Sequence, residues 1–123
     1  LVMKVKKNNR KFKVGKKNDI IITDAGSVFL KNDELVTLKD GKKELDIGKK
    51  NWGYYGTPTL NKRLPKFGYL AVLTRNKIFD TYAVLIVDKR KKKTFLNYLK
   101  REDMKIICWL NHKNLIKIKN TFV

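Results

Sequence analysis

Turn-forming residues divide the first fifty residues into short apolar runs, and this spacing is the strongest constraint on the fold. Turn signals occur at Asn8-Asn9-Arg10, at Asp24-Ala25-Gly26 and at Asp40-Gly41, and between them apolar residues are β-branched or alternate with lysines. Runs this short predict strands rather than long helices. Residues 1–50 are therefore expected to form a β-rich roll or small barrel of about five short strands, drawn from Met3 to Val5, Phe12 to Val14, Ile20 to Ile22, Val28 to Leu30, Glu34 to Leu38 and Glu44 to Ile47.

The composition changes between residues 51 and 67, where glycines and aromatic residues precede a short basic stretch. Thr57 followed by Pro58 is a typical N-cap and first-turn pair, and Pro65 is expected to stop the helix. The sequence thus predicts one or two helical turns from Pro58 to Leu64, preceded by a glycine-rich aromatic loop.

The pattern of strands returns at residue 68. We expect strands at Tyr69 to Thr74 and at Thr81 to Val87, and the second is apolar on both faces, as a central strand would be. A helix from about Lys92 to Arg101, a strand at Lys105 to Leu110 and a short last strand at Leu115 to Ile118 complete a β-β-α-β(-β) unit. The expected fold class is α+β, with both halves sharing one domain over residues 1–123.

The charge of the chain constrains its partner. Thirty Lys and Arg against eleven Asp and Glu give a net charge of +19. A surface this basic repels itself and attracts polyanions at long range, and nucleic acid is the commonest intracellular polyanion. Twenty-five of the thirty bases are Lys, so backbone contact without strong sequence preference is expected, because Lys lacks the bidentate fork with which Arg reads guanine.

The 33 residues between Asp46 and Asp80 contain seven bases and no acid, with aromatic residues interleaved. Bases neutralise phosphates and flat aromatic faces stack on unpaired bases, a mixture that suits single-stranded or structured RNA or DNA. The amides at residues 59–61, at the start of the expected helix, would offer a further anion site. The candidate nucleic-acid-binding residues in this stretch are Trp52, Tyr54, Tyr55, Thr57, Lys62, Arg63, Lys66 and Arg75.

A second basic segment joins the candidate site, the run Lys89, Arg90, Lys91, Lys92 and Lys93. It opens the expected helix at residue 92, where cations oppose the helix dipole unless an anion lies beside them. A plainer interpretation stays open for both segments. The lysines would then be solvated, and Trp52 and Tyr55 would fill the seam between the two halves of the chain.

Residues for catalysis are scarce. His112 is the only histidine, Cys108 the only cysteine and Ser27 the only serine, so neither a zinc site nor a serine triad can be assembled. Glu44 and Asp46 alternate on one face of a strand, which is typical of a solvated face. We therefore expect no metal, no cofactor and no catalytic residue, and the sequence favours a noncatalytic protein over an enzyme.

These features predict a small, strongly basic nucleic-acid-binding protein of low sequence specificity. Two alternatives remain: a viral or accessory module that docks on an acidic protein surface, and a toxin-like, metal-independent ribonuclease that would use His112. The longest apolar run is about seven residues, far short of the roughly 18 to 20 that span a bilayer, so no membrane insertion is expected. The single cysteine favours an intracellular, cytoplasmic location.

Overall fold

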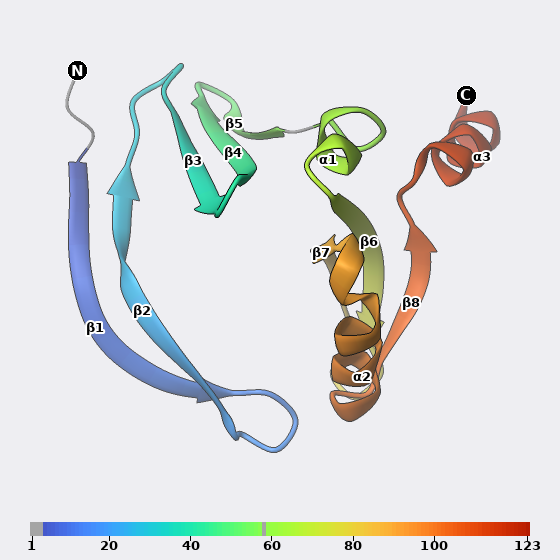
Figure 1. Cartoon of the computed structure of the whole chain (residues 1–123), viewed down its shortest axis with the longest axis horizontal. Helices are drawn as coiled ribbons and strands as arrows, with labels where there is room; N and C mark the ends of the chain where they lie inside the picture. The colour runs from blue at the N-terminus through green and yellow to red at the C-terminus, as the bar shows by residue number, and fades with distance from the viewer. Residues whose placement is uncertain (1–3, 58) are drawn as a thin grey trace.

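The computed structural model describes residues 4–57 and 59–123 and is an α+β protein, as the sequence predicts. The described residues form eight strands in three small open sheets, together with three α-helices and one 3-10 turn. Figure 1 shows how these elements are arranged. The first five strands do form the β-rich N-terminal part, but they make two open sheets rather than one closed roll or barrel.

The first sheet is a long two-stranded hairpin, which we call the arm: β1 (Lys4–Val14) paired with β2 (Ile20–Phe29). Here the sequence-based turns were wrong. Asn8 and Asn9 form a bulge inside β1, and Asp24 and Gly26 lie opposite them within a continuous β2. The side chain of Asn8 accepts from the amide of Asn9 at 2.8 Å and donates to Asp24 at 3.2 Å, so the polar residues that resembled turns satisfy the bulge.

The bulge has a consequence for which side chains share a face. Cross-strand partners Val5 and Val28 lie on the same face of the arm as Phe12 and its partner Ile22, although positions 5 and 12 would fall on opposite faces of a regular strand. The arm is therefore amphipathic. Its other face carries lysines 4, 6, 11 and 13.

The second sheet contains β3 (Leu35–Asp40), β4 (Lys43–Lys50) and β5 (Gly53–Thr57) in the order β3-β4-β5. The predicted hairpin between residues 34 and 47 is confirmed, with Asp40 opposite Lys43 and Gly41 at a φ of 61°. That positive φ is the conformation for which glycine is favoured in a tight turn.

The third sheet has the order β7-β6-β8, formed by β6 (Tyr69–Asn76), β7 (Thr81–Asp88) and β8 (Met104–Trp109). The three strands were expected, but β7 is an edge strand and β6 is central, which corrects the sequence-based assignment. The 3-10 turn η1 (Lys89–Lys91) leads into helix α2 (Lys92–Arg101), which matches its predicted range.

Helix α1 is shorter and later than expected, covering only Arg63–Lys66. Pro58 and the side chain of Thr57 lie outside the described residues, so the expected cap falls there. The residue at the cap position is Lys62, whose side chain makes no cap hydrogen bond, and the hydroxyl of Thr59, three residues earlier, accepts from the amide of Arg63 at 3.0 Å. Pro65 lies inside the first turn, where its missing N–H would have no helical partner in any case.

The chain ends in a helix, α3 (His112–Phe122), where the sequence suggested a short strand at residues 115–118. Asn111 caps it by accepting from the amide of Asn114 at 2.9 Å. The spacing of Leu115, Ile116 and Ile118 is compatible with a strand or with an α-helix. The cap at Asn111 favours the helix.

The core is small and lies in the C-terminal half. Among the described residues, the buried apolar side chains are Leu64, Ala71, Val72, Val87 and Leu99, from α1, β6, β7 and α2. None belongs to the arm. Figure 1 shows the arm standing away from the rest of the chain and returning to it at the hairpin turn.

The turn of the arm is fastened to the loop after α2 by two acidic residues. Glu102 is only 3% exposed, and its carboxylate accepts from the backbone amide of Lys16 at 2.6 Å. The side chain of Lys16 pairs with Asp103, which lowers the pKa of that carboxyl. Gly15 permits the approach, since a Cβ there would lie 2.7 Å from the Glu102 carboxylate.

We predict that Glu102→Ala lowers the free energy of unfolding by about 1 to 3 kcal/mol, because it leaves the amide of Lys16 without its charged acceptor. Glu44→Ala, which removes only a surface ion pair with Lys39, should cost less than about 1 kcal/mol. Urea unfolding followed by circular dichroism measures both. Equal losses in the two variants would show that the fastening does not stabilise the fold.

Candidate nucleic-acid interface

The two basic segments that lie more than twenty residues apart in the sequence meet in the structure. The backbone amide of Lys89 donates to the carbonyl of Gly68 at 2.9 Å, and its side-chain ammonium donates to the carbonyl of Pro65 at 3.3 Å. Helix α1 and turn η1 are therefore neighbours. The lysines around position 65 and those of the run 89–93 share one part of the surface.

A largely buried ion pair positions η1 relative to the second sheet. Lys43 of β4 pairs with Asp88 at the end of β7, with 15% and 11% of the two side chains exposed. The Lys43 ammonium also lies 5.1 Å from the centre of the Tyr69 ring. Asp88 in turn caps η1, because its carboxylate accepts from the amide of Arg90 at 2.9 Å.

The same contacts explain the acidity of Asp88. The hydrogen bond from Lys43 is the largest cause, and together with the bond from the Arg90 amide it lowers the pKa of Asp88 to about 2. The carboxylate also eases the unfavourable placement of cations at a helix start. An acidic residue lies where the first amides of the turn are free, which the sequence pattern alone did not indicate.

A second ion pair makes Arg63 part of the structure as well as of the candidate site. Its guanidinium lies 3.4 Å from the carboxylate of Asp46, which is 8% exposed and also accepts from the hydroxyl of Thr37 at 2.6 Å. The guanidinium also lies over the ring of Phe67, 5.5 Å from its centre. Arg63 is thus occupied in tying α1 to β4.

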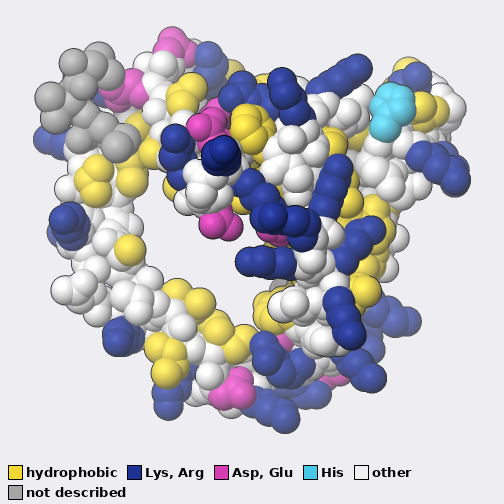
Figure 2. Space-filling view, in the orientation of Figure 1, with side chains coloured by type: hydrophobic (Ala, Val, Ile, Leu, Met, Phe, Trp, Pro, Cys, Tyr) yellow, Lys and Arg dark blue, Asp and Glu magenta, His cyan; other side chains and the backbone are white. Residues whose placement is uncertain are grey.

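The lysines beside these anchors remain exposed. We call Lys62, Lys66 and the lysines of residues 89–93 the basic surface; each is exposed, and none makes an ion pair with a described acidic residue. Lys92 is the one engaged with a ring, 4.8 Å from the centre of Trp109. In Figure 2 the lysines and arginines gather over the part of the molecule that contains α1, β6 and α2.

The acidic residues are used elsewhere. Eight of the eleven take part in ion pairs within the described chain, two of them with the anchors Lys43 and Arg63. Consequently the acids near the basic surface are neutralised by structural partners. The excess positive charge remains available to an external anion.

The aromatic candidates lie at the far end of the β4–β5 hairpin from α1. Trp52 is 66% exposed in the turn, and Tyr54 is 66% exposed opposite Lys49, whose ammonium lies 5.8 Å from its ring centre. Tyr55 points to the other face of the sheet, as its neighbour in sequence must, and is 47% exposed. These exposures do not fit the plainer interpretation in which Trp52 and Tyr55 fill a seam.

Two parts of the predicted site are not brought to the basic surface. Arg75 lies at the opposite end of β6 and pairs with Asp80 at 2.7 Å, which raises the pKa of its guanidinium. The amides of residues 59–61 do not open a helix, because α1 begins at Arg63 and has four residues. The anion site expected there is therefore withdrawn.

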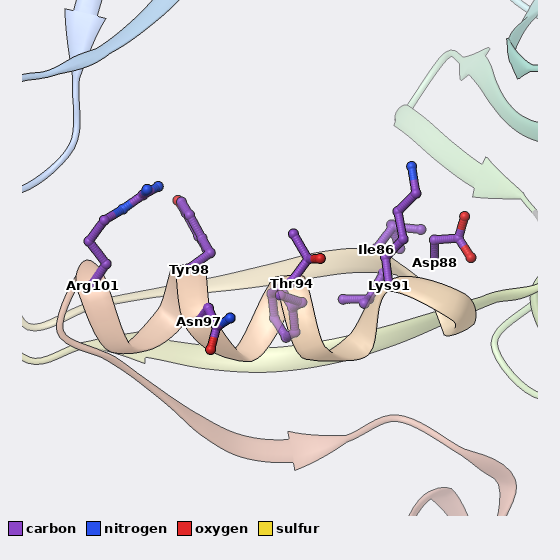
Figure 3. Close-up of a pocket in the computed structure, with 9 residues that line it drawn as sticks. Ile86, Asp88, Lys91, Thr94, Asn97, Tyr98 and Arg101 are labelled. Atoms are coloured by element: carbon purple, nitrogen blue, oxygen red, sulfur yellow. The ribbon is translucent and has the colours of Figure 1, made fainter.

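A groove beside α2 brings Lys91, a predicted site residue, together with Thr94, Tyr98 and Arg101, which the sequence analysis missed. Figure 3 shows Lys91, Thr94, Tyr98 and Arg101 projecting from one side of the helix, next to Ile86 of β7. Their spacing of three, four and three residues is one stripe of an α-helix, so helical periodicity was the signal that could have found them. The groove extends the basic surface along α2 from Lys91 to Arg101.

The described residues provide little for catalysis. They contain no group of three or more His, Cys, Asp or Glu side chains placed to hold a metal ion. His112 begins α3, and its Nδ1 lies 3.1 Å from the side-chain amide of Asn61. Cys108 is a free, partly exposed thiol that contacts the carbonyl of Trp109.

Comparison with known proteins gives no relative: no family model, no curated protein and no solved structure matches this chain. No helix in residues 4–57 and 59–123 has the length and apolar character needed to cross a membrane.

We predict that the Lys43–Asp88 pair makes stability depend on pH in the acidic range. The pKa of Asp88 is about 2 in the folded chain against 3.8 ordinarily, so the unfolded chain takes up the proton first as pH falls. The stabilisation by ionised Asp88 is complete well above pH 3.8 and is lost as pH approaches 2. Asp88→Asn should lack this contribution.

Urea unfolding of the wild type and Asp88→Asn from pH 6 down to about pH 2 measures the effect. The difference in unfolding free energy between the two proteins should be largest at pH 6 and should shrink toward pH 2. Asp19→Asn, at an exposed aspartate that makes no ion pair with a described residue, is the control. A difference for Asp88→Asn that stays constant with pH would contradict the role given to this carboxylate.

Proposed function

We propose that this protein binds single-stranded or structured nucleic acid through the basic surface, without strong sequence preference and without catalysis. The observation that carries the proposal is the contact of Lys89 with Pro65, which joins the basic residues of α1 to those of η1. Either basic segment by itself could be a solvated turn rather than a binding site. Together they concentrate lysines at one place on a chain of net charge +19.

Phosphate contacts supply most of the affinity in this mechanism. Each lysine that neutralises a phosphate releases condensed counterions, so binding weakens steeply with salt. The nearby carboxylates of Asp46 and Asp88 repel a phosphate only weakly, because Arg63 and Lys43 already neutralise them. Lys62, which precedes α1, and Lys66, at its end, are exposed and are the principal phosphate contacts.

Stacking of unpaired bases is the second part of the mechanism. Trp52 and Tyr54 expose about two thirds of their side chains at the end of the β4–β5 hairpin, next to Lys49 and Lys50. An exposed aromatic ring beside an ammonium group can stack on a base while the cation meets the adjoining phosphate. A duplex keeps its bases stacked internally, so single strands and loops are the preferred ligands.

Low sequence specificity follows from the composition of the surface. The arginines on or beside it, Arg63, Arg90 and Arg101, each pair with an acidic residue of the chain. Lysine acts as a point charge and carries little information about base identity. We expect similar affinities for oligonucleotides of different sequence and the same length.

The test is a charge-matched pair of variants. Lys62→Gln/Lys66→Gln/Lys89→Gln removes three contacts of the basic surface, and Lys6→Gln/Lys11→Gln/Lys13→Gln removes three lysines from the outer face of the arm. Each lowers the net charge from +19 to +16. Fluorescence anisotropy with single-stranded and duplex DNA and RNA over a salt series, with heparin as a nonspecific polyanion, measures affinity and salt dependence.

The variant of the basic surface should bind about tenfold or more weakly than the wild type. Its slope of log K against log salt should be shallower by about 2, because each lost phosphate contact removes roughly 0.7 from the slope. The arm variant should stay close to wild type. Equal effects of the two variants would show that binding is diffuse, and the proposed surface would be wrong. Binding to nucleic acid no tighter than to heparin, lost near 0.15 M salt, would instead favour an acidic protein partner.

A further inference from the structure

The chain exposes far more surface than a folded monomer of its size. Its accessible area is 9649 Å². A monomeric protein of 14.5 kDa exposes about 6,900 Å², so the excess is about 2,800 Å² per chain. Obligate homodimers bury roughly 2,000 to 5,000 Å² in total. If each of two chains buried this excess, the total would be large enough for a stable dimer.

Much of the excess lies on the arm. A two-stranded hairpin is marginally stable by itself in water, and this one has no third strand among the described residues. Phe12, Val28 and Val5 lie on one face with 39%, 45% and 53% of their surface exposed. Figure 2 shows hydrophobic side chains along the inner side of the arm and an open space between it and the rest of the molecule.

Among the described residues, the inner face is covered only near the hairpin turn. There Val14 and Ile20 approach Phe79, Tyr98 and Met104 across a shared pocket. Farther along, the face carries Lys7 and the ion pair of Arg10 with Asp24, at 3.6 Å, between its apolar ends.

The edge strand β7 leaves a second apolar area uncovered. Tyr82, Val84 and Ile86 alternate along it and are 62%, 55% and 40% exposed. The sequence pattern of this strand is that of a strand buried on both faces. Within one copy of the chain it is not buried on both faces, and a partner would complete the burial that the pattern indicates.

We infer that this protein forms a homodimer in which the inner face of the arm packs against a second copy of the chain. The arm's inner face is self-complementary, since Arg10 of one copy can meet Asp24 of the other while the apolar ends come together, as a two-fold interface requires. Lysines 4, 6, 11 and 13 lie on the opposite face and stay in water, so of the six bases of β1 only Lys7 and the paired Arg10 face the second copy.

The first test is the mass of the wild-type protein in solution. Sedimentation equilibrium in about 0.5 M salt, which shortens the Debye length to a few ångströms and releases bound nucleic acid, should give twice 14.5 kDa. A monomer throughout an accessible concentration series would overturn the inference. This result does not depend on whether the protein binds nucleic acid.

A matched pair of variants locates the interface. Phe12→Lys places a charge on the inner face, and Ile21→Lys places the same charge on the outer face of the neighbouring strand. Phe12→Lys should weaken dimerisation by about tenfold or more, and Ile21→Lys should leave it near wild type. Equal weakening, or none with Phe12→Lys, would overturn the assignment of this face. Circular dichroism of both variants confirms that each is folded.

Discussion

The ion pair between Lys43 and Asp88 is the interaction on which the arrangement of the surface depends. It joins β4 of the second sheet to the end of β7 in the third, and it lies against the ring of Tyr69. Asp88 also caps the turn that begins the run of lysines. One carboxylate thus connects two sheets and fixes the direction in which a basic segment leaves the core. Loss of either partner would leave a largely buried charge without its partner, which costs more than the pair itself contributes.

In this chain of net charge +19, three of the few acidic residues connect different parts of the fold. Asp46, Asp88 and Glu102 are all largely buried, and each holds two elements together: β4 with α1, β7 with β4, and the arm with the loop after α2. Their partners are basic side chains, backbone amides and, for Asp46, also the hydroxyl of Thr37. The remaining bases are left at the surface, where a polyanion would lower their mutual repulsion.

The sequence predicted the elements better than their connections. Helix α2, the hairpin of residues 34–47 and the three C-terminal strands follow from local patterns, and all were found. Asn8 and Asp24 were misassigned because a polar pair that fills a bulge has the same composition as a turn. The α+β class is confirmed, whereas closure of a barrel depends on pairing between distant strands, which no local pattern specifies.

For the candidate site, too, the sequence indicated the residue types but not the contacts between distant segments. Exposed lysines and aromatic residues could be named from composition, but the contact of Lys89 with Pro65 joins segments that are distant in sequence. The ion pairs of Arg63 and Arg75 were equally invisible, and they separate residues that maintain structure from those free to bind. Tyr98 and Arg101 could have been found, because their helical spacing with Lys91 is present in the sequence.

The most direct test of the proposed surface is an NMR titration of the ¹⁵N-labelled protein with a single-stranded oligonucleotide at physiological salt. We predict that amide signals of residues 62–66 and 89–93 shift together in one titration, and that the indole signals of Trp52, which is exposed, and of Trp109, which lies against Lys92, shift with them. Shifts confined to the arm, or spread evenly over all the lysines, would contradict the assignment of α1 and η1 to one nucleic-acid-binding surface.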